Sequence, residues 1–372
     1  MNIRSQTGQL QAENGGLASF EADQPVDADR VRLARAENPK LRERDLAQRL
    51  GISEAEFLAA GGSGPVIRLD IHFEDIFNGL KKVGEVMSLV RNDSAVHEKI
   101  GPFEKFVPGR QAAMMLGEQI DQRIFPAHFV HGYAVEKTDG TAVRHSLQFF
   151  DAHGDAVMKI HARAATDMDA WSALVSSLAA EDQSEGLSER LSPAPLQVRP
   201  DADPSKEQAL RQRWKAINDP HQFFGMLRDL EMDRLNALHM AGEDLAWELE
   251  GGTVAAMLKL AAQEQIPVMC FIGSRGCIQI HQGVVHDIKE MGPWINIMDP
   301  TFHMHLRQDH IAEVWAVRKG ADHGHVTSIE AYDAAGRLIV QFFGVRGEGN
   351  AERGDWRGLV ENLPRVRSME VA

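Results

Sequence analysis

The sequence predicts an α+β protein built by tandem duplication, in which each half combines helices with a mostly antiparallel β-sheet. The first observation is an internal repeat at a constant offset of 182 positions, which places Val86-Met87 on Val268-Met269. The second is that the same offset superimposes two hairpin turns, DAHG at 151–154 and DAAG at 333–336. The third is that each half closes with a tryptophan-bearing helix, TDMDAWSALV and ERGDWRGLV.

The repeat defines the domain organisation. Residues 1–25 are rich in Gln, Gly, Ala and Asp and predict a flexible lead, and residues 26–180 form the N-terminal repeat. Residues 181–206 hold four prolines and many charges, which is typical of a linker. Residues 207–372 form the C-terminal repeat. Two such halves are expected to leave a cleft between them, where ligands preferentially bind.

The first half begins with helices over residues 28–60, and Ser53 with Glu56 forms a capping-box pair. This stretch also resembles a helix-turn-helix, so DNA binding is an alternative to a purely structural helical pair. The formal net charge of −14 opposes nucleic acid as the main partner. An amphipathic helix near 73–83 and a series of strand-like runs follow, ending in the helix of TDMDAWSALV.

The second half carries the most informative stretch, WKAINDPHQFFGML at 214–227. Asp219-Pro220 is a strong helix start, which puts His221 in the first turn and spaces Phe223, Leu227 and Leu230 along one buried face. A helix N-terminus favours neutral imidazole, the form that binds a metal. The alternative is a capped helix with a partly exposed histidine that binds nothing.

Other features limit the function. The two cysteines, Cys270 and Cys277, match no common zinc spacing, and no phosphate-binding glycine loop or nucleophile elbow occurs. His303 and His305 share one face of a predicted strand, and His323 and His325 flank a glycine, but no carboxylate at convincing spacing completes either pair as a metal site. The polar N-terminus and the lack of a long apolar run predict a cytoplasmic soluble protein without stable membrane insertion.

Several motifs together resemble the cytoplasmic hemin-degrading or hemin-transport family (HemS/HmuS/ChuS-like) of bacterial haem-uptake systems. In the first half they are ENPKLRERDLAQRLGISEAE, GEVMSLVRNDSAVHEKIG, QIDQRIF, SLQFFDAHGDAVMKIH and TDMDAW. In the second half they are DPHQFF, FIGSRGCIQI, WINIMDPTFHMHL and EVWAVRKG. The resemblance covers about residues 30–364 and implies a duplicated helix-plus-sheet fold with haem held in a cleft.

The resemblance also implies roles for single residues. His221 in DPHQFF matches the axial ligand of the haem iron, and Arg123 in QRIF matches an arginine on the opposite, distal face. The remaining matches are two aromatic residues of the distal side, two cations near the propionates or haem edge, and a histidine of a second haem site in some members: Phe125, Phe271, Lys319, Arg346 and His97. Phe343 stands where relatives often carry tyrosine.

Elementary chemistry agrees with these roles, because haem requires an imidazole, an apolar slot and cations for two propionates. For His97, a structural role at a strand end is an equal alternative to ligation. Two functions stay open: oxidative opening of the haem ring, and non-enzymatic delivery of haem to a separate haem oxygenase. A third reading is a duplicated interaction module without a cofactor. No flavin or nicotinamide fingerprint occurs, so electrons would come from a reductase or another external donor.

Overall fold

The computed structural model describes residues 25–366 except 63, 141, 188, 190, 196–198 and 347–349. The predicted flexible lead therefore lies, except for residue 25, outside the described residues. Within the described part of the chain, no helix is long and apolar enough to cross a membrane.

The helices of the first half form where the sequence predicts them: α1 (Ala28–Glu37), α2 (Glu43–Leu50), α3 (Glu54–Ala59), α4 (Phe73–Leu80) and α5 (Met168–Leu178). The predicted capping box is present at the start of α3, where the Ser53 and Glu56 side chains each accept from the other residue's backbone N–H. All six residues of α3 are buried. The second helix of the helix-turn-helix-like stretch therefore has no free face to enter a DNA groove.

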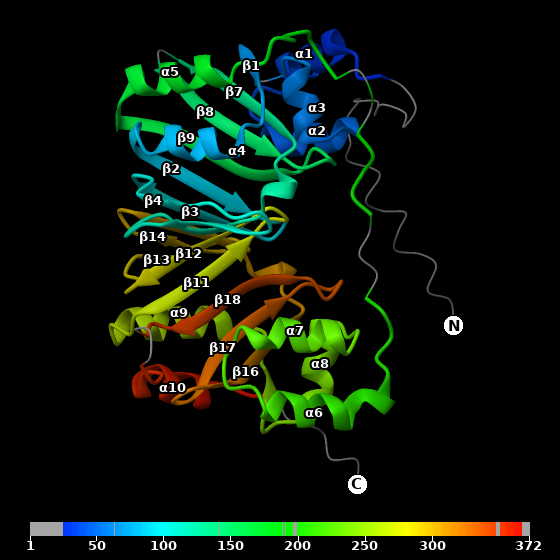
Figure 1. The fold of residues 1–372 in the computed structure, drawn as a ribbon, viewed down its shortest axis with the longest axis vertical. Coiled ribbons are helices and arrows are strands. Elements are labelled where there is room, and N and C mark those ends of the chain that lie inside the picture. The colour runs from blue at the N-terminus through cyan, green and yellow to red at the C-terminus, as the bar shows by residue number, and fades with distance from the viewer. Residues whose placement is uncertain are drawn as a thin grey trace.

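The helices of the second half are α6 (Glu207–Lys215), α7 (Gln222–Asp229), α8 (Arg234–Ala241), α9 (Thr253–Gln263) and α10 (Gly354–Glu361). Short 3-10 helices occur at η1 (Pro126–His128), η2 (Pro204–Lys206) and η3 (Gln308–His310). Figure 1 shows α1–α5 at one end of the long axis and α6–α10 at the other, with the sheets between them.

The strands of the described residues form two nine-stranded antiparallel sheets. The first sheet has the order β1 (Val66–Leu69), β7 (His131–Asp139), β8 (Ala142–Phe150), β9 (Ala156–Thr166), β2 (Gly84–Arg91), β3 (Ala95–Gly101), β15 (Phe302–Arg307), β14 (Trp294–Met298), β13 (Ile288–Met291). The second has the order β10 (Ala246–Leu249), β16 (Glu313–Ala321), β17 (Gly324–Tyr332), β18 (Leu338–Gly344), β11 (Val268–Gly273), β12 (Cys277–Gly283), β6 (Asp121–Ile124), β5 (Ala113–Leu116), β4 (Lys105–Val107).

The repeat is visible in the hairpins that join β8 to β9 and β17 to β18. Gly154 and Gly336 occupy equivalent turn positions with φ of 77° each, a left-handed conformation that glycine adopts without strain. The predicted α+β duplication is thus confirmed.

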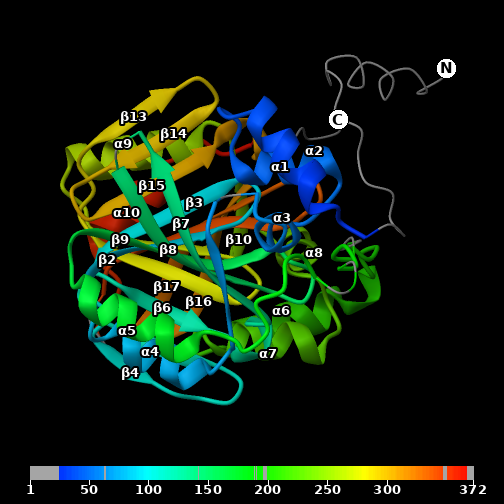
Figure 2. The same ribbon diagram turned by 90° about the horizontal axis from the view of Figure 1, so that it is seen from above.

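The halves exchange strands, which the repeat alone did not reveal. Strands β13, β14 and β15 of the second half extend the first sheet beyond β3, and Figure 2 shows them beside it. Strands β4, β5 and β6 of the first half extend the second sheet beyond β12 in the same way. Each sheet is therefore completed by the other half.

A local two-fold axis relates the two halves and passes through the contact between the sheets. Gln279 donates to the Nδ1 of His97 at 3.1 Å, and the Nζ of Lys99 lies 3.3 Å from the Nδ1 of His281. Each of these pairs joins two residues 182 positions apart, the offset of the repeat. Equivalent residues that touch each other must lie on the axis that relates the two halves, so these two contacts mark that axis.

Candidate functional site

One face of the second sheet collects most of the predicted site residues. Directly opposed residues of antiparallel strands share a face. Between β17 and β18, Phe343 opposes Ser328 and Gln341 opposes Glu330. On β11, Phe271 opposes Gln341 of β18 on one side and Ile280 of β12 on the other. On the next strand pair Ile278 opposes Arg123. Lys319 shares this face because Val317, two residues earlier, opposes Ser328.

Helices cover only part of this face. α6, α7 and α8 bury Trp214, Phe223 and Leu235 against Trp315, Val317 and Tyr332 of the outer strands. Beyond them lies a half-buried strip formed by Met269, Phe271, Ile278, Phe343 and Arg123. Phe223 of α7 and Phe343 of the strip both contact the Lys319 ammonium, whose Nζ lies 4.9 Å and 5.5 Å from the two ring centroids. The start of α7 is therefore adjacent to the strip.

His221 is the N-cap residue of α7, one position before the helix rather than in its first turn. The predicted buried face is present, with Phe223, Met226 and Leu227 buried. The His221 side chain itself is 90% exposed. One carboxylate oxygen of Asp219 accepts from the His221 backbone N–H at 2.9 Å and contacts the ring Nδ1 at 2.8 Å.

These contacts select the tautomer of the neutral ring. The hydrogen bonds from the His221 backbone and side chain, together with the positive charge of Arg346, lower the pKa of Asp219. The carboxylate is therefore ionised at neutral pH and can only accept, so the neutral imidazole carries its proton on Nδ1. The lone pair of Nε2 is left facing solvent, in the form that binds a metal.

The two predicted cations differ in availability. Arg346 follows β18, is half-buried, and lies close enough to Asp219 to influence its ionisation. Lys319 is only 4% exposed and donates to Glu330 at 2.8 Å. Burial lowers the pKa of Lys319 to about 8, although the Glu330 carboxylate opposes this shift. The Lys319 Nζ also donates to the Ser328 hydroxyl at 3.3 Å, so a propionate could use only the third N–H of a lysine that is almost fully buried.

The predicted distal residues lie on or next to β6. Arg123 is half-buried, and its Nη1 donates to the Asp121 carboxylate and to the Gln122 carbonyl. Phe125 follows the strand, is half-buried, and is held by its N–H to the Gly276 carbonyl at 2.9 Å. Phe271 and Phe343 meet edge to face with centroids 5.3 Å apart. The phenylalanine at 343 makes this part of the strip apolar.

His97 does not share this face. It lies inside β3 rather than at a strand end, and none of its surface is exposed. Its Nδ1 contacts Gln279, and its ring lies against Phe302 with centroids 4.8 Å apart. Burial, followed by the nearby His281 and Lys99, holds the pKa of His97 well below its usual value. This placement favours the structural reading, because a second haem could reach His97 only by separating the sheets.

His303 and His305 do share one face of β15, as predicted. The structure adds a partner for each ring: Glu98, from the other half, contacts the Nδ1 of His303 at 3.0 Å, and Asn296 of the neighbouring strand contacts the Nδ1 of His305 at 2.7 Å. No group of three or more metal-ligating side chains occurs among the described residues.

Sequence analysis did not identify three residues of the site: Asp219, Glu330 and Arg234. The Asp219 contact had a local signal, since DPH places the carboxylate two residues before the imidazole. Glu330 and Arg234 had none. Glu330 is fully buried and accepts from Arg234 at 2.6 Å and 2.8 Å, so this pair anchors α8 to β17 beneath the strip.

Two cavities are found away from these side chains. One of about 380 Å³ lies between α6 and α7 and is lined by Arg213, Ala216, Ile217, Gln222, Gly225, Met226 and Asp229. The other, of about 220 Å³, belongs to the first sheet. Neither is lined by His221 or by the strip, so the haem cleft stays a prediction.

Comparison with known proteins supports one family. The model of the haemin-degrading HemS/ChuX domain matches residues 51–178 and 231–363, which leaves His221 outside both ranges. The chain is 35% identical over 340 residues to the hemin transport protein HemS of Yersinia enterocolitica, covering 91% of this chain and 96% of that protein. The hemin transport protein HmuS of Yersinia pestis gives the same values.

Solved structures agree. Holo-PhuS, a heme-binding protein from Pseudomonas aeruginosa, superimposes with a TM-score of 0.86 at 36% identity, covering 91% of this chain and 98% of that one. ChuS, an E. coli heme oxygenase, gives a TM-score of 0.79 at 34% identity, with 88% and 98% covered. The chain therefore belongs to the HemS/ChuX family of haemin-degrading domains.

Proposed function

We propose that this protein binds haem in the cytoplasm after import and opens the ring oxidatively, so that iron is released. The observation that carries the proposal is the exposed imidazole of His221, whose Nδ1 is held by Asp219 beside the half-buried strip. The relatives support haem as the ligand, since they are described as hemin transport, heme-binding and heme oxygenase proteins.

The residues present fit haem chemically. The free Nε2 of His221 supplies the imidazole that haem iron prefers, and Phe271 with Phe343 supplies part of an apolar slot. Arg346 supplies a cation near His221 for charge-assisted hydrogen bonds to a propionate. Haem supplies the iron and is itself the molecule consumed.

The side chains of this protein have separate tasks in that reaction. Asp219 orients the His221 ring and keeps its proton on Nδ1. Arg123 lies on the same sheet face as Phe271, where a preorganised donor can stabilise negative charge that develops on the distal side. Asp121 and Gln122 contact Nη1 and hold the guanidinium in place, so Nε and Nη2 can donate to the ligand.

A haem carrier is the second candidate. The observation in its favour is the exposure of the binding edge, because His221 is 90% exposed and the neighbouring Phe224 is 65% exposed. An exposed axial ligand suits reversible hand-over to a separate haem oxygenase. The enzyme reading instead requires an electron-donor reductase.

Binding is tested by hemin titration followed in the Soret region. We expect His221→Ala to lose the ferric spectrum of the wild type and to bind hemin more weakly, with native far-UV circular dichroism. His97→Ala is the control and should keep the main spectrum. An unchanged ferric spectrum in His221→Ala would overturn the assignment of the axial ligand.

Enzyme and carrier are separated by Arg123→Ala in single-turnover spectra, with an electron donor, oxygen and catalase present. If the protein is catalytic, this variant should hold His221-ligated haem yet lose ring opening by roughly 100-fold or more. If the wild type shows no turnover but passes haem readily to an added haem oxygenase, the carrier reading is correct.

A further inference from the structure

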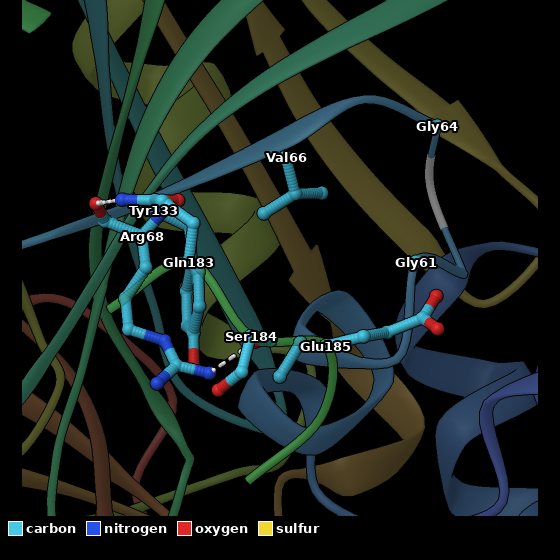
Figure 3. A pocket seen from close by; sticks show the side chains of 9 residues that line it. Gly61, Gly64, Val66, Arg68, Tyr133, Gln183, Ser184 and Glu185 are labelled. Carbon is cyan, nitrogen blue, oxygen red and sulfur yellow. Dashed lines mark hydrogen bonds between the residues drawn. The ribbon is translucent and has the colours of Figure 1, made fainter. Parts of the chain in front are cut away.

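The cavity in the first half holds two buried donors without partners. Its walls come from α3, β1, β7 and the start of the linker: Ala59, Gly61, Gly64, Val66, Arg68, Tyr133, Gln183, Ser184 and Glu185. Tyr133 is only 1% exposed. Among the described residues, neither the Tyr133 hydroxyl nor the Arg68 Nε has a hydrogen-bond partner, although both atoms are buried. Figure 3 shows the Tyr133 hydroxyl end, the Arg68 guanidinium and Ser184 gathered at one side of the cavity.

The other nitrogens of Arg68 are already used. Nη1 donates to Asp182 at 3.2 Å, and Nη2 donates to the carbonyls of Ser184 and Gly186 at 2.8 Å and 2.5 Å. These bonds hold the guanidinium in place, so its unused Nε–H has a fixed direction. Burial raises the pKa of Tyr133 to about 12, so the phenol is neutral and is a donor at physiological pH.

In the second half, the side-chain donor at the position equivalent to Tyr133 has a partner. Trp315 stands at the position equivalent to Tyr133, 182 residues later, and its Nε1 donates to Glu313 at 2.9 Å. An unsatisfied buried donor is costly, so a pair of them in one wall indicates that an acceptor completes the site.

We propose that this cavity binds a small carboxylate with an apolar body, whose oxygens accept from the Tyr133 hydroxyl and the Arg68 Nε–H. The two neighbouring donors suit the two oxygens of a carboxylate, although Asp182 already pairs with the guanidinium and Glu185 also lines the cavity. Ala59 with Val66 faces the apolar part. The volume of about 220 Å³ is larger than the roughly 150 Å³ of a cavity that holds benzene. Benzoate therefore matches the site in size and chemistry. None of these residues belongs to the haem site.

The presence of only two tyrosines, Tyr133 and Tyr332, gives a direct test. In the full chain labelled with fluorotyrosine, benzoate should shift one fluorine NMR signal saturably and leave the other in place. Tyr133→Phe should remove the signal that moves. Equal concentrations of sodium chloride and benzamide are the controls. If neither signal moves, or if benzamide shifts the same signal equally, the proposal fails.

Variants provide a second readout, the benzoate-induced rise of the unfolding temperature. Tyr133→Phe without ligand should unfold at the same or a higher temperature, because the removed hydroxyl has no partner. It should also bind benzoate at least tenfold more weakly. Arg68→Lys keeps the charge but removes Nε–H and should weaken binding about tenfold, whereas Arg44→Lys, the matched surface control, should not. Benzoate binding unchanged in Tyr133→Phe would overturn the proposal.

Discussion

Asp219 is the residue that would prepare His221 for the proposed ligation of haem. It fixes the position of the His221 backbone, selects the tautomer of the ring and leaves Nε2 free. The partners of metal-ligating histidines commonly have this role, and removing them weakens metal binding. The alternative is that these contacts only hold the turn before α7, and an experiment separates the two roles.

We expect Asp219→Asn to weaken hemin binding roughly tenfold to 100-fold, because a neutral amide is a poorer acceptor for Nδ1–H. The less electron-rich imidazole should also raise the reduction potential of bound haem, which spectroelectrochemistry measures. Asp229→Asn, an exposed aspartate of the same helix, is the matched control. If Asp219 only holds the turn before α7, the reduction potential should stay unchanged.

At the scale of the elements, buried ion clusters anchor the helices to the sheets. In the second half Arg234 of α8 pairs with Glu330 of the sheet. In the first half the charges are reversed, because the helix carries the anion: Glu54 of α3 pairs with Lys159 and Arg91 of the sheet. Glu54 and Arg234 are the first residues of equivalent helices. The duplicated fold thus keeps an ionic anchor while exchanging which element carries the negative charge.

Glu330→Gln should lower the free energy of unfolding by about 3–5 kcal/mol, because it leaves Arg234 and Lys319 as buried cations without their anion. Urea unfolding measures this change. Glu290→Gln removes the exposed pair with Lys259 and should cost no more than about 1 kcal/mol. Equal effects of the two variants would contradict the anchoring role.

The whole molecule is held together by the contact between the sheets, and titratable groups lie in it. Burial, followed by the charge of Lys99, lowers the pKa of His281 to about 3, against an ordinary value of 6.5. His97 is lowered in the same direction. Both rings are therefore neutral in the folded protein at pH values where they are protonated in the unfolded chain.

This difference sets the sign of the pH dependence. Below about pH 6.5 the unfolded state binds more protons, so the free energy of unfolding should fall as the pH falls. Where a histidine is protonated in the unfolded chain but neutral in the folded protein, the free energy of unfolding falls by about 1.4 kcal/mol per pH unit. Urea unfolding between pH 7 and pH 4 should show a shallower decline for His281→Gln than for the wild type. Parallel curves would contradict this account.

Strand exchange makes a prediction about the isolated halves. Residues 26–180 alone would lack β13–β15, and residues 207–372 alone would lack β4–β6. Each half should therefore pair with a second copy of itself, exchanging three strands, and sediment as a dimer. In such dimers the axis would bring Lys99 against Lys99 in the first half but His281 against His281 in the second. The first-half dimer should be the weaker, and two stable monomers would contradict the argument.

The sequence by itself determined the features that depend on neighbours along the chain. The capping box at Ser53, the two glycine turns, the helix around Phe223 and the duplication all follow from local spacing and self-similarity. The candidate residues of the haem site came instead from the resemblance of short motifs to the HemS/HmuS/ChuS-like family. Local spacing concerns a few residues and self-similarity shows only which positions are equivalent, so neither could show which residues about 180 positions apart touch each other.

Only the tertiary structure decided which strands complete each sheet and which side chains share a face. It placed Phe271, Phe343 and Arg123 on one strip, buried His97 between the sheets and committed Lys319 to Glu330. The physical reason is that strand register and sheet stacking are set by burial over the whole molecule. The residues next to a histidine or lysine in the sequence therefore do not show whether its side chain lies at the surface or in the core.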